Sequence, residues 1–92
     1  MASINFAFRN QSVANGKFSG DIEVSGDDFS GNSYKQSQHV EFDAAKEWDI
    51  PVGPCSVHVS VWMATPTQAC VDGHLQCGPA RQPTNGPFCV NA

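Results

Sequence analysis

Hydrophobic and polar residues alternate along much of this chain, which is the pattern of β-strands with one buried face. The alternation first appears in residues 4–8 and returns in residues 18–24, with isoleucine, phenylalanine and valine on one side. These residue types favour a pleated sheet over a helix. We therefore expect two antiparallel strands, each with one face in the core.

The register of these two strands depends on the turn between them. Asn15-Gly16 is typical of a two-residue hairpin turn, but that turn would set Phe8 opposite Glu23 and put the two apolar sets on opposite faces. A three-residue loop, Ala14-Asn15-Gly16, instead sets Phe8 opposite Ile22. We predict the register with the longer loop.

Two further strands are expected in the middle of the chain. Residues 34–42 alternate loosely and predict a third strand. Residues 46–52 keep strand parity and predict a fourth. As an alternative, residues 43–47 could form one helical turn that is capped by Asp43, and Pro51 would prevent a longer helix.

Residues 55–62 show the clearest alternation and predict a fifth strand. Apolar side chains occupy one face, and polar side chains with one tryptophan occupy the other. Cys55 and His58 then point to opposite faces, so they cannot bind one metal ion together. The inward set is Cys55, Val57, Val59 and Val61, and the outward set is Ser56, His58, Ser60 and Trp62.

The segment that contains Asp72-Gly73 predicts another hairpin. This dipeptide is typical of a hairpin tip, and its short arms would be residues 69–71 and 75–77, which contain Cys70 and Cys77. A disulfide between these two cysteines could close the hairpin.

The C-terminal residues 78–92 are rich in proline and glycine and predict an irregular segment. Such a segment would be poorly ordered unless it were attached to the domain. We therefore expect a second disulfide between Cys55 and Cys89. Four cysteines allow three pairings, and the sequence does not decide among them.

Two short motifs resemble corners of known all-β families. Phe29-Ser30-Gly31, followed by Tyr34, resembles the aromatic-x-Gly corner of βγ-crystallin Greek keys. The calcium signature of that family is absent, because Gly31 and Asn32 occupy its hydroxyl positions. Ile50-Pro51-Val52-Gly53 resembles the Ile-Pro-x-Gly corner of immunoglobulin-like sandwich modules.

The fold that follows is a small two-layer antiparallel β-sandwich with six to eight short strands. Its strand order is expected to be Greek-key or immunoglobulin-like, and its C-terminal segment to be tied by disulfides. The 92 residues suffice for one domain with a thin core, so we expect residues 1–92 to form a single domain.

Charge and hydropathy exclude several classes of partner. The net charge is −4, eight of the nine acidic residues lie within residues 21–49, and the basic residues form no cluster. Such a chain cannot neutralise many phosphates, so we expect neither nucleic acid nor an anionic membrane surface as a partner. No apolar run is long enough for a transmembrane segment or a signal peptide.

The cysteine content indicates an oxidising compartment. Four cysteines in a short, loop-rich chain favour two disulfides, and disulfides persist mainly outside the cytosol. We therefore expect the mature form of a secreted or extracellular protein. A zinc knuckle formed by Cys70, His74 and Cys77, with a fourth ligand from Cys55 or Cys89, is the alternative.

The outward face of residues 55–62 is the first candidate binding surface. Serine hydroxyls and the imidazole of His58 lie beside the flat indole of Trp62, a combination that suits a sugar ring. The alternative is that a second layer covers this face and makes Trp62 a core residue. The candidate ligand-binding residues here are Ser56, His58, Ser60 and Trp62, with Tyr34 as a further stacking residue.

A second candidate site is the turn that contains Asp27, Asp28 and Asn32. These residues offer three oxygen ligands within six positions, which suits calcium or sugar hydroxyls. EF-hand spacing is absent, because Asn32 stands where glycine is required. A solvated turn is the favoured interpretation, and we expect neither a metal nor another cofactor.

Catalytic motifs are absent from the sequence. It contains no Gly-x-Ser-x-Gly, His-Glu-x-x-His, glycine-rich phosphate loop or Cys-x-x-Cys. We therefore expect a non-catalytic recognition module and favour carbohydrate as its ligand, because the surface is rich in small polar residues and poor in charge. The alternatives are a secreted protein-binding effector, toxin or enzyme inhibitor that uses residues 78–87, and a homo-oligomer that assembles through edge strands.

Overall fold

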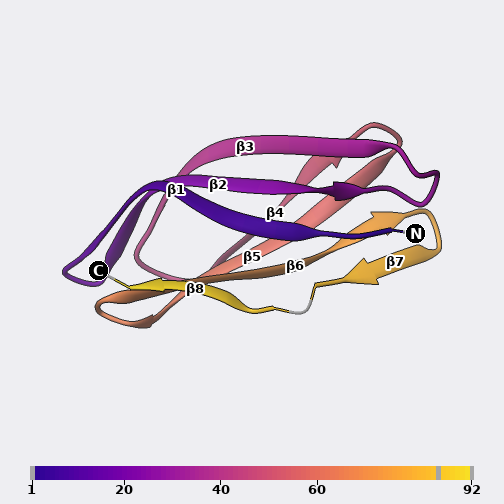
Figure 1. Ribbon diagram of the computed structural model, residues 1–92. Helices are drawn as coiled ribbons and strands as arrows, with labels where there is room; N and C mark the ends of the chain where they lie inside the picture. The colour runs from indigo at the N-terminus through magenta and orange to yellow at the C-terminus, as the bar shows by residue number, and fades with distance from the viewer. Residues whose placement is uncertain (1, 85, 92) are drawn as a thin grey trace.

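The computed structural model describes residues 2–84 and 86–91, which form strands joined by turns. Figure 1 shows two antiparallel sheets packed face to face, which confirms the predicted sandwich. The eight strands are β1 (Asn5–Ala14), β2 (Lys17–Asp27), β3 (Ser33–Phe42), β4 (Lys46–Val52), β5 (Cys55–Thr65), β6 (Gln68–Cys77), β7 (Ala80–Pro83) and β8 (Phe88–Asn91).

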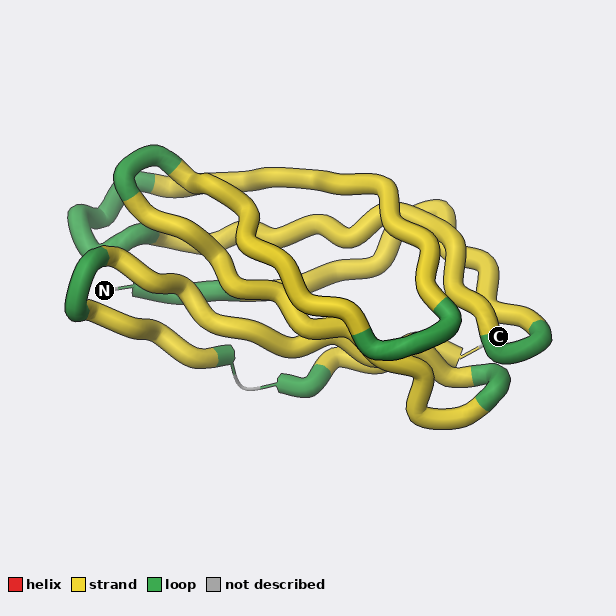
Figure 2. Tube along the Cα trace, turned by 180° about the vertical axis from the view of Figure 1, so that it is seen from behind, coloured by secondary structure: helices red, strands yellow, loops and turns green. Residues whose placement is uncertain are grey.

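Each sheet is a meander. The first sheet has the order β1-β2-β3, and the second has the order β4-β5-β6-β7, with β8 paired to another part of β6. The Greek-key or immunoglobulin-like order that we expected is therefore wrong in detail. A Greek key needs a long connection that returns beside an earlier strand, whereas short turns join most neighbours here. Figure 2 shows these turns gathered at the two ends of the sandwich.

The predicted register of β1 and β2 is confirmed. Phe8 lies opposite Ile22, so the apolar sets of both strands share the inner face. The turn is nevertheless the two-residue turn that we rejected. Asn15 and Gly16 both have positive φ, 55° and 77°, as that type of turn requires.

A β-bulge in β1 makes the short turn compatible with this register. The pairing shifts between Arg9 and Ser12, so that Asn10 and Gln11 together face Gly20 of β2. Asn10 is left-handed, with φ of 51°. A Cβ atom on Gly20 would lie 2.8 Å from the Cα of Gln11, so the bulge depends on a glycine at this position. Alternation alone could not predict the bulge, because the residues around it are polar and exposed.

The core lies between the two sheets and comes from alternate residues of their strands. The stacked rings of Phe18 and Phe42 have centroids 4.9 Å apart within the first sheet. The ring of Phe6 packs edge-on against that of Phe88 of the second sheet, with the two centroids 6.2 Å apart. Burying a side chain of this size stabilises the fold by about 1.5–3 kcal/mol. The side chains with no exposed surface include Phe18, Ile22, Val24, Val57, Val59, Val71 and Leu75.

The third and fourth predicted strands are present as β3 and β4. Residues 43–45 form a bend between them, so the alternative of a helical turn is wrong. Trp48 of β4 packs against the edge of the core, and its indole N–H donates a hydrogen bond to Oε1 of Gln38 at 3.0 Å. This contact joins β3 of the first sheet to β4 of the second sheet.

Strand β6 continues through Asp72-Gly73, where we predicted a hairpin tip. The tip between β5 and β6 lies instead at residues 66–67, and Gly73 pairs with Val59 in the middle of the ladder. A Cβ atom on Gly73 would overlap the backbone carbonyl oxygen of His58. The glycine therefore marks a close approach of two strands and not a turn.

The two expected disulfides are present, but the predicted pairing is wrong. Cys55 pairs with Cys77 across β5 and β6, and Cys70 pairs with Cys89 across β6 and β8. Cys70 and Cys77 cannot pair, because seven residues along an extended strand span about 23 Å. All four sulfur atoms lie in disulfides, so the thiolates that the zinc alternative requires are not present.

The C-terminal segment is attached to β6 as expected, but it is more regular than the sequence predicted. Both β7 and β8 pair with β6, and the Cys70–Cys89 disulfide fixes β8. Strand β7 was missed because it is short and ends in Pro83, and proline is tolerated only at the edge of a sheet. No helix within residues 2–84 and 86–91 has the length and apolar character needed to cross a membrane.

Candidate functional site

The outer face of the first sheet carries charged side chains that pair with one another. Glu23 lies 3.5 Å from Arg9 and 3.8 Å from Lys35. Asp21 lies 3.0 Å from the ring of His39. These pairs form a solvated, largely neutralised surface.

The outer face of the second sheet is different, because it contains a hollow of about 390 Å³ over β4–β7. Cross-strand pairing assembles it. One row across β4, β5 and β6 consists of Glu47, Ser60 and Asp72. Neighbouring strands lie about 4.8 Å apart, so polar groups from distant parts of the chain come together. The lining residues are Glu47, His58, Ser60, Trp62, Asp72, Gly73, His74 and Arg81.

His58 is held in the hollow by two carboxylates of β4. Its Nε2 lies 3.0 Å from Oε1 of Glu47, and its Nδ1 lies 3.0 Å from Oδ1 of Asp49. Both nitrogens can donate only when the ring is protonated. The hydrogen bonds to Glu47 and then Asp49 therefore raise the pKa of His58. The bond from His58, together with one from Ser60, lowers the pKa of Glu47.

His74 lies directly opposite His58, and the two rings stack at 5.3 Å with an interplanar angle of 28°. Nη2 of Arg81 lies 3.3 Å from Nδ1 of His74 and donates to it, because a guanidinium has no acceptor. Burial, followed by the charges of Arg81 and His58, lowers the pKa of His74. His74 is therefore a neutral ring whose Nε2 carries the hydrogen.

Asp72 forms part of the wall of the hollow and is bound to the backbone beside it. Its Oδ1 accepts a hydrogen bond from the Gly73 N–H at 2.8 Å and another from the hydroxyl of Thr84. The Thr84 N–H also donates to the carbonyl oxygen of Gly73 at 3.4 Å. These bonds hold the connection after β7 against β6 and fix the shape of the wall.

Several polar groups of the hollow have no hydrogen-bond partner among the described residues, and they include both donors and acceptors. The donors are the indole N–H of Trp62, the Nε2–H of His74, and the Nε and Nη1 groups of Arg81. The acceptors include Oδ2 of Asp72 and Oε2 of Glu47, whose Oε1 already binds His58 and Ser60. The hollow can therefore exchange hydrogen bonds with a ligand that has several hydroxyl groups.

Comparison with known proteins gives no match. No family model, curated protein or solved structure matches this chain. The function must therefore be inferred from the geometry of the hollow.

Three of the four outward residues predicted on β5 line the hollow. They are His58, Ser60 and Trp62, whereas Ser56 lies opposite Pro51 in the next row and outside the lining. The first sheet packs against the opposite face of β5, so Trp62 is half-buried on an outer face and is not a core residue.

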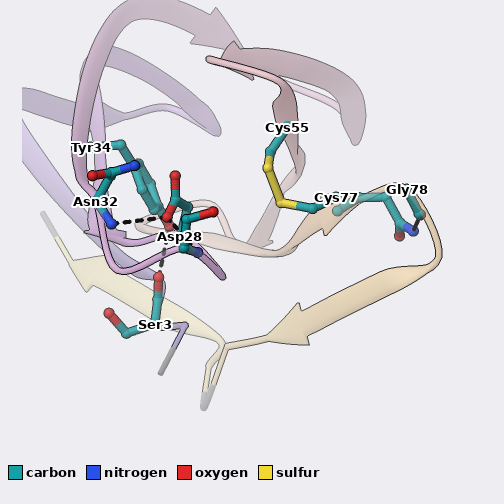
Figure 3. Close-up of a disulfide and its surroundings, with 9 residues drawn as sticks. Ser3, Asp28, Asn32, Tyr34, Cys55, Cys77 and Gly78 are labelled. Carbon is teal, nitrogen blue, oxygen red and sulfur yellow. Dashed lines mark hydrogen bonds between the residues drawn. A yellow bond between two sulfur atoms is a disulfide. The ribbon is translucent and has the colours of Figure 1, made fainter.

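The residues predicted in the β2–β3 turn lie at one end of the sandwich, near a disulfide (Figure 3). Oδ1 of Asp28 accepts hydrogen bonds from the backbone N–H groups of Ser30 at 2.8 Å and Asn32 at 2.9 Å. Oδ1 of Asp27 accepts one from the hydroxyl of Ser33 at 2.9 Å. The two carboxylates thus stabilise their own turn, which favours the solvated-turn interpretation.

Tyr34 belongs to the same end of the first sheet and is anchored there (Figure 3). Its hydroxyl donates a hydrogen bond to the carbonyl oxygen of Ser3 at 2.8 Å. Burial, with smaller effects from Asp27 and Asp28, raises the pKa of Tyr34 to about 12. Tyr34 does not line the hollow, so the structure does not bring it together with Trp62.

Six residues of this region were not predicted as part of the binding surface: Glu47, Asp49, Asp72, Gly73, His74 and Arg81. They come from β4, β6 and β7 and reach His58 only through strand pairing. The continuous β6 places His74 opposite His58. The predicted hairpin at residues 72–73 would have separated the two residues, so the pairing was not predicted. Within residues 2–84 and 86–91, no group of three or more histidine, cysteine, aspartate or glutamate side chains is arranged to hold a metal ion.

We expect the two stacked histidines to give the stability of the protein opposite pH dependences. The pKa of His58 is raised above its ordinary value of 6.5, so its contribution is complete below pH 6.5 and is lost as the pH rises through the folded-state pKa. The pKa of His74 is lowered below 6.5, so stability is lost as the pH falls from 6.5 through its folded-state pKa. Denaturant unfolding between about pH 5 and pH 8.5 measures the unfolding free energy on both limbs of this pH profile, the one above pH 6.5 and the one below it.

Variants of the two histidines separate these contributions. His58→Gln should flatten the limb above pH 6.5, and His74→Gln should flatten the limb just below it. His39→Gln changes the third histidine, which lies on the first sheet, and should leave the difference between the two limbs intact. The interpretation of the pair fails if the profiles of the His58 and His74 variants run parallel to that of the wild type.

Proposed function

We propose that this protein is a non-catalytic carbohydrate-binding module that takes a sugar in the hollow on the outer face of the second sheet. The observation that carries the proposal is the position of the Trp62 indole beside polar groups that have no described partner. A sugar ring stacks its C–H face on an aromatic plate while its hydroxyls form hydrogen bonds at the sides. The hollow of about 390 Å³ lies within the usual size range of ligand sites.

The rigidity of the hollow supports the same proposal. Its side chains stand on paired strands, and two carboxylates already fix the ring of His58. Trp62 lies opposite Cys70, which the disulfide to Cys89 holds in place. A site that is ordered before binding loses little entropy when the ligand arrives.

The compartment is part of the proposal. Two disulfides stabilise a domain of this size best where thiols are oxidised. We therefore place the protein outside the cytosol, as a secreted or extracellular module.

We expect Trp62→Ala to weaken sugar binding by about tenfold or more, because the stacking surface is lost. A glycan panel identifies a ligand for the wild-type protein, and titration calorimetry then compares the variants. Tyr34→Phe is the matched aromatic control, because Tyr34 lies outside the hollow. If a sugar bound both variants as tightly as it binds the wild type, its binding site would lie outside the hollow.

A protein-binding effector, toxin or inhibitor is the second candidate function. Phe29, in the β2–β3 turn, is a large hydrophobic side chain that is 43% exposed. Exposed aromatic residues are common anchors of protein interfaces. A silent glycan panel, combined with a protein pull-down that Phe29→Ser abolishes, would favour this function over carbohydrate binding.

A further inference from the structure

We propose that the hollow takes an acidic disaccharide, with a neutral sugar ring against Trp62 and a hexuronic acid ring whose carboxylate binds Arg81 while His74 donates to another oxygen of the same ligand. This inference rests on the proposed function, since it names the class of sugar that the same site prefers. It is carried by the charge, spacing and hydrogen-bonding state of the residues at the two ends of the hollow.

Arg81 provides the first argument. The chain has two arginines, and the other one, Arg9, lies 3.5 Å from Glu23 on the first sheet. Arg81 forms no ion pair with any described residue, although it lines a hollow. Only its Nη2 is bonded, to a neutral imidazole. Its remaining N–H groups keep the planar geometry that fits a carboxylate in a bidentate manner.

His74 adds a second donor, on the side of its ring that points away from this guanidinium. Because Arg81 donates to Nδ1, the hydrogen of the neutral ring lies on Nε2. The ring of His58 stacks on His74 at 5.3 Å, and both of its nitrogens are already occupied by Glu47 and Asp49, so it does not compete for a ligand. The cationic guanidinium of Arg81 and the Nε2–H of His74 therefore define an anion-binding end of the hollow.

Glu47 defines the opposite end. It stands on β4, whereas Arg81 stands on β7, and three strand spacings separate these strands by about 14 Å. Glu47 already binds His58 and Ser60 through Oε1, and its second oxygen can accept a hydrogen bond from a sugar hydroxyl. The hollow thus has donors at the Arg81 end, which favour a carboxylate, and an acceptor at the Glu47 end, which favours a hydroxyl.

The position of Trp62 requires more than one sugar ring. Trp62 and His58 are four residues apart on the same strand, which corresponds to about 13 Å. A ring that stacks on the indole cannot also bring a carboxylate to the far side of the histidine pair. Two linked rings span this distance, with the neutral ring on Trp62 and the acidic ring at Arg81.

The overall charge limits the number of carboxylates in the ligand. The protein has a net charge of −4, Glu47 and Asp72 line the hollow, and Asp49 is bonded to His58 beside it. A polymer of uronic acid would be repelled by these groups, whereas a single carboxylate at Arg81 avoids them. An acidic disaccharide with one neutral ring fits this distribution best.

The test compares an aldobiouronic acid, which is a hexuronic acid linked to a neutral sugar, with the same disaccharide after reduction of its carboxyl group to an alcohol. Titration calorimetry of the wild-type protein should show about tenfold tighter binding of the acid than of the reduced form. Arg81→Gln should reduce this preference to about equal binding of the acid and the reduced form, and a melting temperature close to that of the wild type shows that the variant is folded. Arg9→Gln removes the same charge from the first sheet and should keep the preference.

The possible results separate this inference from the proposed function. Equal binding of the acid and the reduced form by the wild-type protein overturns the acidic-sugar inference and leaves carbohydrate binding intact. A preference that persists in Arg81→Gln also overturns it. If neither disaccharide nor any sugar of a glycan panel binds, the proposed function and the inference both fail.

Discussion

Replacement of Gly73 by alanine should destabilise the protein by about 3 kcal/mol or more. The added Cβ would overlap the carbonyl oxygen of His58 and approach Cζ of Phe6 to 3.2 Å. A backbone atom in a central ladder cannot move aside as a flexible side chain can, so β5 and β6 would have to separate. In a domain of this size, such a loss lowers the melting temperature by about 15 °C, which calorimetry or circular dichroism measures.

Gly53→Ala is the matched control for Gly73→Ala. Gly53 has φ of 64° and nothing within 4 Å of an added Cβ, so alanine meets only backbone strain there. That strain costs about 1–2 kcal/mol. If Gly73→Ala were no more destabilising than Gly53→Ala, Gly73 could not lie in the β5–β6 ladder as described.

Removal of the Cys70–Cys89 disulfide should have an effect of similar size. The bond closes a segment with a sequence separation of 19, and loop-closure entropy predicts a loss of about 3 kcal/mol for the double variant Cys70→Ala, Cys89→Ala. Denaturant unfolding under non-reducing conditions measures this loss. The loss should be accompanied by release of β8, because the disulfide joins it to β6.

Thiol titration of the same double variant tests the pairing. The structure leaves Cys55 and Cys77 joined, so the denatured, unreduced variant should show no free thiol. The pairing that the sequence suggested would leave Cys55 and Cys77 without their partners, and two thiols would titrate. The second result would contradict the strand order of the second sheet as well as the disulfides.

The strands themselves could be predicted from alternation, because each has one face in the core. On β5 the inward Val57 and Val59 are fully buried, while the outward His58 and Ser60 line the hollow, as the period of two requires. The register of Phe8 with Ile22 was also predictable, because the one-residue shift that a two-residue loop without a bulge would give exposes one apolar set.

The glycine-containing dipeptides could not be interpreted from local sequence alone. Asn15-Gly16 forms a two-residue turn, whereas Asp72-Gly73 lies within a strand. Both pairs satisfy the local preferences of a turn. The difference arises from the partner strand, because Gly73 must accommodate the His58 carbonyl oxygen and Gly16 faces open space.

The lining of the hollow was only partly predictable for the same reason. His58, Ser60 and Trp62 share one strand, and periodicity places them together. His74 and Arg81 reach His58 through the pairing of β6 with β5 and β7, which the sequence does not specify. The pKa shift of His58 arises from the carboxylates of β4 and that of His74 first from burial, so neither could be inferred from residue spacing.

The most direct test of sugar binding in the hollow is a nuclear magnetic resonance titration that follows the two tryptophan indole N–H signals. The Trp48 indole is bonded to Gln38 at the edge of the core, whereas the Trp62 indole lines the hollow and has no described partner. Addition of a disaccharide ligand should shift the Trp62 signal progressively and leave the Trp48 signal in place. A shift of the Trp48 signal alone, or saturation of binding with no change at Trp62, would contradict a sugar site on this face.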